Sequence, residues 1–264
     1  MTAAAGLQTV LTVPKRFRGP EGTANGGWIS GTLAGTLTGG GHDSPVEVTL
    51  RKPVPLETAL LVEHVGNAVV LNQGEGHLVE AIPVAETLTP PPFVRFTDAA
   101  RAEAGFPGRN GHAIAGCFAC GLREPGDGLR IFPGPVKDPV KDPVQDHVEN
   151  SADGTELVAA GWRVPFNVTD EQGVVPDSIV WAALDCATGW AHHRSFPDRR
   201  PIQPPLLGRL TGQVFRRVYP MGRYSVVARA EGRDGRKLFG TSAVYEVDGT
   251  LVAAAKATWI LPRQ

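Results

Sequence analysis

The chain has 264 residues, of which 42% are hydrophobic and 20% are charged, and its formal net charge is −1. This composition is sufficient for a sizeable core and excludes disordered and collagen-like proteins. The 26 basic residues against 27 acidic ones provide no positive field, so we expect no nucleic-acid partner. Three cysteines cannot build a disulfide framework, and their odd number favours a reducing, cytoplasmic compartment. No targeting sequence or run of eighteen apolar residues is found, so we expect no membrane insertion.

The N-terminal part, residues 1–92, alternates apolar segments with turn residues. The pattern predicts a strand over Leu7–Val13 and a glycine-rich, apolar helix over Asn25–Leu37. Alternation of apolar and polar residues then predicts four antiparallel strands. These strands are Val46–Lys52, Ala59–Val65, Ala68–Gln73 and His77–Ala85.

Residues 93–127 are rich in proline and glycine and indicate a linker with little regular structure beyond a short helix near Asp98–Ala104. The linker contains the sequence CFACG, from Cys117 to Gly121. Further along, the repeated KDPV of Lys137–Asp146 indicates a solvated loop.

The C-terminal part, residues 128–264, shows the same order of elements. Strands are predicted over Leu129–Phe132 and Leu157–Val164, and a helix over Pro176–His192. Four more strands follow, at Leu210–Val218, Tyr224–Glu231, Lys237–Val247 and Leu251–Leu261. The repeated order predicts an internal duplication.

Two short local matches support the duplication. The turn and strand start at Glu75–Val79 resemble those at Asp248–Val252, and the basic pair Arg51-Lys52 resembles Arg216-Arg217, each before a proline bend. A coincidental resemblance of two α+β segments is the alternative.

The predicted helix over Pro176–His192 is apolar on nearly every side, so we expect it to be buried. Its stripe of apolar side chains follows the spacing of one helix face, and Pro176 and Asp177 suit a helix start. Asp185 lies within this element. A carboxylate there must be paired, hydrogen-bonded or shifted in its pKa.

Three motifs resemble a known family. They are Asn25-Gly26-Gly27 at the start of the first helix, Asp185 in the second, and CFACG followed by Gly128-Leu129-Arg130. Together with the duplicated order they resemble the PaaI-like acyl-CoA thioesterase superfamily with a double hotdog fold, in particular an uncharacterised CFxCG-containing branch. Such enzymes carry His-Gly-Gly at the helix start and an acid nine residues after the histidine. In this chain Asn25 replaces the histidine and Ala34 stands at the acid position of the first copy, whereas the second copy has Asp185.

The resemblance implies an α+β fold of two tandem hotdog units, each an antiparallel sheet wrapping a central helix, that form a pseudo-dimer. It also implies hydrolysis of acyl-CoA or related thioesters. The helix start at Asn25, Gly26 and Gly27 would polarise the carbonyl, and Asp185 would act as general base or nucleophile. No cofactor is expected beyond the coenzyme A of the substrate, and further association into a homo-oligomer is open. The alternatives are a non-catalytic acyl-CoA or lipid-binding hotdog protein and, third, a hotdog hydratase.

Further side chains are candidates for substrate binding, each with a structural alternative. Those candidates are Ser178, Trp28, Trp181, Arg216 and Arg217. The serine suits a backbone cap, the tryptophans suit core packing, and the arginines suit a solvated surface.

The spacing of Cys117 and Cys120 invites a metal or redox interpretation. Two thiolates supply half of a tetrahedral zinc site, and His112 and His147 are the only nearby histidines. We therefore expect no bound metal and a turn that packs small side chains.

Overall fold

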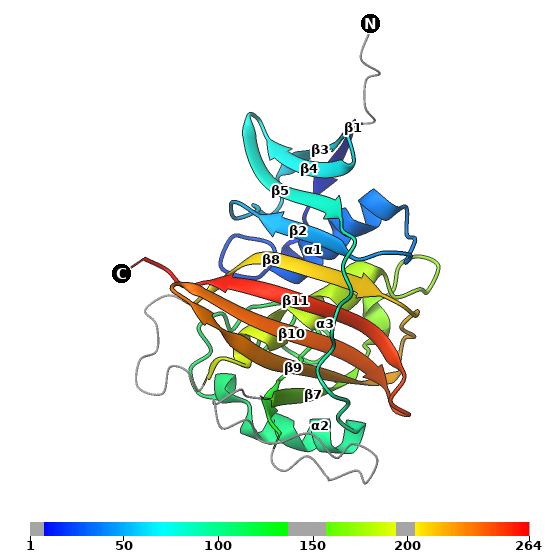
Figure 1. Ribbon diagram of the computed structural model, residues 1–264, viewed down its shortest axis with the longest axis vertical. Helices are drawn as coiled ribbons and strands as arrows, with labels where there is room; N and C mark the ends of the chain where they lie inside the picture. The colour runs from blue at the N-terminus through cyan, green and yellow to red at the C-terminus, as the bar shows by residue number, and fades with distance from the viewer. Residues whose placement is uncertain (1–7, 137–156, 194–203, 264) are drawn as a thin grey trace, which may run out of the picture.

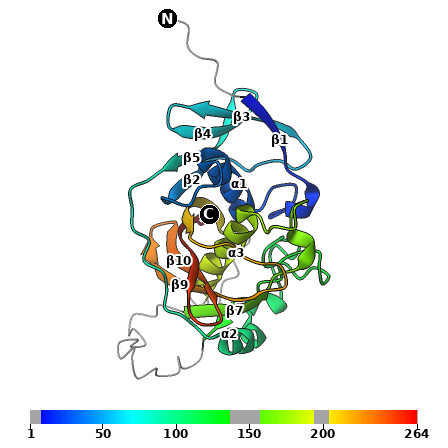
Figure 2. The same cartoon turned by 90° about the vertical axis from the view of Figure 1, so that its right-hand side faces the viewer.

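A computed structural model describes residues 8–136, 157–193 and 204–263, and all structural statements below concern these residues. They form one antiparallel sheet with the strand order β1-β3-β4-β5-β2-β8-β11-β10-β9-β7-β6 (Figure 1). Helices α1 and α3 lie together on one face of this sheet (Figure 2). The predicted loop over Lys137–Asp146 lies outside the described residues.

The first half of the chain contains one long helix and five strands. Its elements are β1 (Gln8–Thr12), the 3-10 turn η1 (Lys15–Phe17), α1 (Gly26–Thr38), β2 (Val46–Leu50), β3 (Ala59–Val65), β4 (Ala68–Gln73) and β5 (Gly76–Pro83). The second half repeats this order. Its elements are β6 (Gly134–Pro135), β7 (Leu157–Arg163), η4 (Phe166–Val168), α3 (Asp177–Trp190), β8 (Leu206–Val214), β9 (Arg223–Asp234), β10 (Lys237–Glu246) and β11 (Leu251–Ile260).

The halves meet at the antiparallel pair β2–β8, which lies between two mirrored runs of strands. Corresponding backbone hydrogen bonds fix the equivalence: the Lys52 N–H donates to the Leu78 carbonyl, and the Arg216 N–H donates to the Val252 carbonyl. Lys52 therefore corresponds to Arg216. The sequence match, which placed Lys52 opposite Arg217, is wrong by one residue, because the bulged residues that accept these bonds, Leu78 of β5 and Val252 of β11, are the structural equivalents.

The two long helices pack tightly because α1 presents glycine to α3. Gly31 lies so close that a Cβ there would be 2.6 Å from the Trp181 Cβ and 2.7 Å from the Ser178 Cα. Asn25 caps α1, and Gly39 ends it with a φ of 62°. Pro176 is the N-cap residue of α3, so that helix begins at Asp177. No helix in the described ranges has the length and apolar character needed to cross a bilayer.

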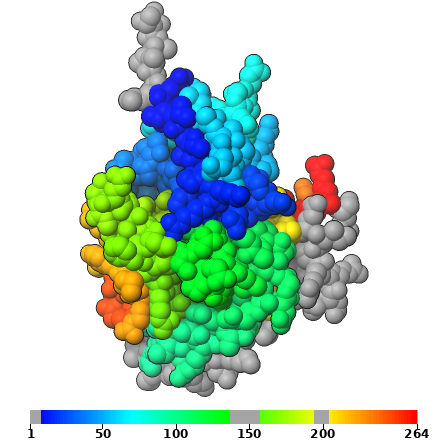
Figure 3. All heavy atoms as spheres, turned by 180° about the vertical axis from the view of Figure 1, so that it is seen from behind, coloured from blue at the N-terminus to red at the C-terminus, as the bar shows by residue number. Residues whose placement is uncertain are grey.

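The connection between the halves covers both faces of the molecule. After β5 it crosses the sheet face opposite α1 and α3 (Figure 1), where the Tyr245 hydroxyl donates to the Pro91 carbonyl at 2.5 Å. It then forms α2 (Phe96–Ala102) and the short turns η2 (Glu103–Gly105) and η3 (Pro107–Arg109). Residues beyond η3 lie behind the helices, against the N-terminal segment (Figure 3). The predicted short helix is thus present as α2.

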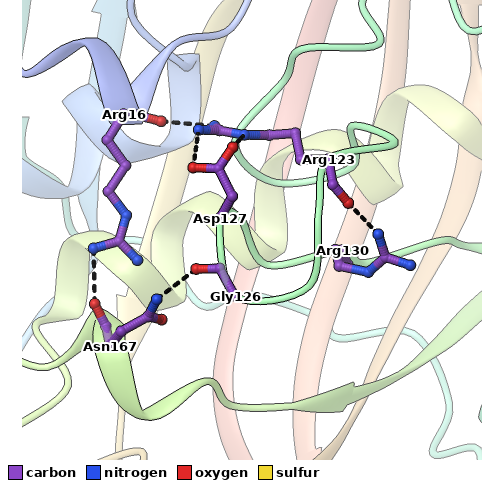
Figure 4. A network of polar contacts seen from close by, with 6 residues as sticks. All are labelled: Arg16, Arg123, Gly126, Asp127, Arg130 and Asn167. Carbon is purple, nitrogen blue, oxygen red and sulfur yellow. Dashed lines mark hydrogen bonds and ion pairs between the residues drawn. The ribbon is translucent and has the colours of Figure 1, made fainter.

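A network of polar contacts fastens the end of this connection (Figure 4). Arg123, which is 6% exposed, donates to both carboxylate oxygens of Asp127, at 2.7 and 2.8 Å, and to the Arg16 carbonyl at 2.7 Å. The Arg16 guanidinium in turn donates to the Asn167 carbonyl at 2.7 Å. The network joins the connection to both halves.

One predicted strand, Leu129–Phe132, is wrong. Its backbone bonds instead to the CFACG turn, with the Leu129 N–H donating to the Phe118 carbonyl and the Ile131 N–H to the Ala119 carbonyl. Arg130 between them has a φ of 54°, which extended strands do not adopt. The apolar pattern of this segment reflects burial and not strand formation.

Candidate functional site

The start of α1 and the middle of α3 meet at one carboxylate. Asp185 is 1% exposed, and its Oδ2 accepts hydrogen bonds from the Gly27 N–H at 2.9 Å and from the Asn25 Nδ2 at 3.1 Å. The Asn25 Oδ1 accepts from the Trp28 N–H at 2.8 Å, so Asn25 caps α1 and holds Asp185 at once. The Asp185 Oδ1 has no hydrogen-bond partner among the described residues. One carboxylate oxygen is thus fixed by two hydrogen bonds, and the other is buried without a partner among the described residues.

Burial raises the pKa of Asp185 to about 7, and the nearby Cys117 adds to the rise. The hydrogen bonds from the Gly27 N–H and the Asn25 amide oppose it. This confirms the expectation that a carboxylate at this position is hydrogen-bonded and shifted in its pKa. A carboxyl group with a pKa near 7 can both accept and donate a proton at neutral pH.

The contact between the halves depends on the absence of a side chain at Gly27. A Cβ there would lie 2.5 Å from both the Asp185 Cβ and the Trp181 carbonyl oxygen. Glycine therefore lets the backbone N–H of α1 reach the carboxylate of α3.

A cavity of about 340 Å³ reaches this carboxylate. Its lining includes Asn25, Gly26 and Asp185, together with apolar side chains and two basic ones. The apolar side chains are Ile29, Leu50, Val54, Ile114, Leu206, Leu207, Trp259 and Ile260, and the basic ones are Arg51 and Lys52. An apolar cavity with a few polar groups at one place is typical of a small-molecule site.

Only one of the two predicted glycine N–H groups is free for a ligand. The Gly27 N–H is taken by Asp185, whereas the Gly26 N–H donates to no described residue and Gly26 lines the cavity. It lies at the positive end of α1, where a partial negative charge is stabilised. The available donor in the described part of the chain is therefore Gly26.

The remaining predicted binding residues do not line this cavity. Trp28 stacks on Phe17 with ring centroids 4.3 Å apart, and Trp181 packs beneath Gly212. Ser178 lies at the contact with α1, and Arg216 and Arg217 are exposed beyond β8. Lys52, which corresponds to Arg216, and its neighbour Arg51 do line the cavity.

Three thiols gather beside Asp185. The sulfurs of Cys117, Cys120 and Cys186 lie within 4.8 Å of one another, and those of Cys117 and Cys186 are 3.6 Å apart. Hydrogen bonds with the thiols of Cys120 and Cys186 lower the pKa of Cys117 well below its usual value. The bond with Cys117 raises the pKa of Cys120, and the bond with Cys186 opposes that rise. Bonds with Cys117 and Cys120 raise the pKa of Cys186. The sequence predicted no role for Cys186 beyond its place in a helix. Its position next to Asp185 in sequence was the one available signal.

No protein-family model matches the chain, and no curated protein matches its sequence. Solved structures do match its fold over nearly the whole length. The tesB protein of Mycobacterium avium subs paratuberculosis is similar with a TM-score of 0.59 and 14% identity, over 97% of this chain and 93% of that one. Acyl-CoA thioesterase II TesB2 of Mycobacterium marinum gives 0.56 and 10%, over 97% and 93%.

A conserved protein of unknown function with a hot dog fold from Alicyclobacillus acidocaldarius gives a TM-score of 0.57 and 14% identity, over 99% of this chain and 96% of that one. The repeated order of elements, the continuous sheet and these similarities agree. The chain has an α+β, double hotdog fold, as the sequence predicted.

Proposed function

We propose that the chain hydrolyses acyl-CoA or closely related thioesters in the cavity between its halves. The observation that carries the proposal is Asp185: a buried carboxylate fixed through one oxygen, with its other oxygen unpartnered, at the wall of an apolar cavity. Two solved structures of the same fold bear the names tesB protein and acyl-CoA thioesterase II, which supports a thioester as the substrate. The three free cysteines fit a reducing, cytoplasmic compartment.

The chemistry follows from the geometry of the two helices. The thioester carbonyl oxygen accepts a hydrogen bond from the Gly26 N–H, which stabilises negative charge as the carbonyl carbon is attacked. Asp185 takes a proton from water, and the resulting hydroxide adds to the carbonyl carbon. The C–S bond then breaks, the thiolate takes the proton from Asp185, and a carboxylic acid and a free thiol leave. Direct attack by Asp185, followed by hydrolysis of an anhydride, is the other route.

The cavity lining divides between the two ends of such a substrate. Apolar side chains, among them Leu207 and Trp259, suit the acyl chain. Arg51 and Lys52 suit the phosphates of coenzyme A, because cationic side chains form strong charge-assisted hydrogen bonds to phosphate. Arg216 and Arg217 remain the alternative phosphate contacts.

The test is release of free thiol from acyl-CoAs of graded chain length by the purified protein. Asp185→Asn keeps the shape of the side chain and removes the base, so we expect turnover to fall on the order of 100-fold or more. Asp177→Asn is the matched control, because this acid lies on the same helix, outside the cavity lining, and pairs with His42 at 2.7 Å. Full activity in Asp185→Asn, or none in the wild type at any chain length, contradicts the proposal.

A second candidate is binding of an acyl thioester without turnover. It is favoured by the burial of Asp185, since a side chain that is 1% exposed must move to meet a substrate. Isothermal titration with an acyl-CoA followed by mass analysis of the recovered ligand separates the two. Binding with the thioester returned intact supports this candidate, and recovery of free coenzyme A supports hydrolysis.

A further inference from the structure

The three cysteines of the chain come from two distant segments and meet at one point. Cys117 and Cys120 lie in the CFACG turn, and Cys186 projects from α3. The three sulfurs lie within 4.8 Å of one another, with 3.6 Å between those of Cys117 and Cys186. In a tetrahedral zinc site with Zn–S bonds of about 2.3 Å, neighbouring sulfurs are about 3.8 Å apart. The cluster therefore has the dimensions of three corners of such a site.

The turn that carries two of the sulfurs is shaped to stabilise a thiolate. The pKa of Cys117 is lowered well below its usual value, most by the thiols of Cys120 and Cys186 and further by the backbone N–H groups of Cys120 and Ala119. Gly121 closes the turn with its N–H on the Cys117 carbonyl at 3.0 Å, and a Cβ there would lie 2.3 Å from that oxygen. No residue but glycine fits, so the sequence CFACG specifies this geometry.

A further donor faces the sulfurs from the first half. The Asn25 Nδ2 lies 3.6 Å from the Cys117 sulfur and 3.9 Å from the Cys186 sulfur. Three thiolates and one divalent cation carry a net charge of −1, and an N–H donor beside two of the sulfurs offsets it. The Asn25 Nδ2 would thus donate hydrogen bonds both to the thiolates and to Asp185.

We propose that Cys117, Cys120 and Cys186 bind one zinc ion, or a similar soft divalent cation, through their thiolates. Cys117 and Cys186 line the cavity and Cys120 does not, so the fourth position faces the cavity and takes a water molecule or a substrate atom. A disulfide would use two of the three sulfurs and leave the third unexplained. All three thiol groups are buried, where a bound cation would compensate the charge of the thiolates.

The bound ion would tie the connection between the halves to α3. The CFACG turn also donates from the Phe118 N–H to the Arg18 carbonyl at 2.8 Å, ahead of the start of α1. The cation would therefore join three segments around Asn25 and Asp185. This role is positional, and it does not depend on hydrolysis at the site.

The test is the metal content of the full chain, purified without an added metal-binding tag, measured before any substrate is added. We expect about one zinc per chain as purified or after titration with Zn²⁺ alone. Substitution by Co²⁺ is expected to give the intense near-ultraviolet sulfur-to-cobalt charge-transfer absorption of thiolate ligation. Cys120→Ser removes a ligand outside the cavity, and we expect it to weaken the apparent affinity on the order of 100-fold or more.

The matched control is His112→Gln. His112 contacts the Cys120 carbonyl through Nε2 at 3.1 Å, so this variant disturbs the same turn and leaves all three sulfurs. It should keep one zinc per chain and the cobalt absorption. Binding of less than about a tenth of an equivalent, no charge-transfer absorption, or a wild-type mass lower by two hydrogens from a disulfide would each overturn the proposal. Loss of binding in His112→Gln as complete as in Cys120→Ser would also overturn it.

Discussion

Replacement of Gly27 by alanine tests how the two halves make contact. The added Cβ would lie 2.5 Å from the Asp185 Cβ, 2.5 Å from the Trp181 carbonyl oxygen and 2.8 Å from the Ala182 Cα. These atoms belong to the backbone or to the base of a side chain, so no rotamer change relieves the overlap. The helices must separate by about 1 Å to restore ordinary van der Waals contact.

The magnitude follows from three terms. Overpacking a core costs about 1–3 kcal/mol, and weakening the Gly27 hydrogen bond to a buried carboxylate adds about 1 kcal/mol. The higher helix propensity of alanine stabilises the folded state by about 1 kcal/mol. We expect a net loss of about 2 kcal/mol, which lowers the Tm by roughly 4–8 °C in a chain of this size.

The chain provides matched controls on the same helix. Gly35 has nothing within 4 Å of the position of a Cβ, so Gly35→Ala should raise the Tm by roughly 2–4 °C. Gly31→Ala should destabilise as Gly27→Ala does, although it removes no bond to Asp185. Thermal unfolding followed by circular dichroism measures all three. If Gly27→Ala and Gly31→Ala are as stable as Gly35→Ala, the helix contact is not as described.

The other predictions concern pH, the connection and the cavity. The carboxyl of Asp185 ionises near pH 3.8 in the unfolded chain and near pH 7 in the folded one, so the folded state holds its proton more tightly. As the pH rises from 3.8 to 7, the free energy of unfolding of the chelator-treated wild type should therefore fall by roughly 4 kcal/mol relative to that of Asp185→Asn. Urea unfolding at a series of pH values checks this, and a constant difference would contradict it. Arg123→Lys loses the bidentate contact of a buried guanidinium with Asp127 and should destabilise the fold by about 1–3 kcal/mol. Arg101→Ala breaks an exposed pair with Asp98 and should change the stability by less than about 0.5 kcal/mol. Equal urea midpoints for the two variants would contradict a stabilising role of the network. Lys52→Ala should raise the KM for an acyl-CoA several-fold more than for the phosphate-free acyl-pantetheine, and a larger effect of Arg217→Ala would place the phosphates elsewhere.

The sequence predicted the elements well because their signals are local. Periods of two and 3.6 residues gave both long helices and every described strand except the two-residue β6, with ends correct to within four residues. The burial of Asp185 was also predictable, since a helix that is apolar on nearly every side leaves a carboxylate in its middle no solvated face to occupy. Leu129–Phe132 failed because an apolar run predicts burial and not the hydrogen-bond partner, which here is a neighbouring turn.

The parts of the site that were missed depend on tertiary packing. Cys186 follows Cys120 by 66 residues and Cys117 by 69, and no spacing rule joins a helix cysteine to that turn. The hydrogen bond from the Gly27 N–H to Asp185 depends on where α1 crosses α3. Gly27 and Gly31 make the close crossing possible, but they do not specify which residues of α3 they meet. The correspondence of Lys52 to Arg216, and not to Arg217, follows from backbone hydrogen bonds to the bulged residues Leu78 and Val252, which the two basic pairs in the sequence do not reveal.

The pseudo-symmetry of the fold explains why one such site occurs in the described part of the chain. Asn25 and Pro176 are the corresponding N-cap residues of α1 and α3, so Ala34, nine residues after Asn25, corresponds to Asp185, nine after Pro176. At the symmetry-related position proline offers no side-chain donor and alanine no carboxylate. The connection joins the halves once, so the CFACG turn lies at one end of the helix pair, beside Asn25 and Cys186. Divergence of the two copies has therefore gathered the carboxylate, its amide partner and the thiols at one end of the helix pair, and a stoichiometry of one ligand per chain follows from that asymmetry.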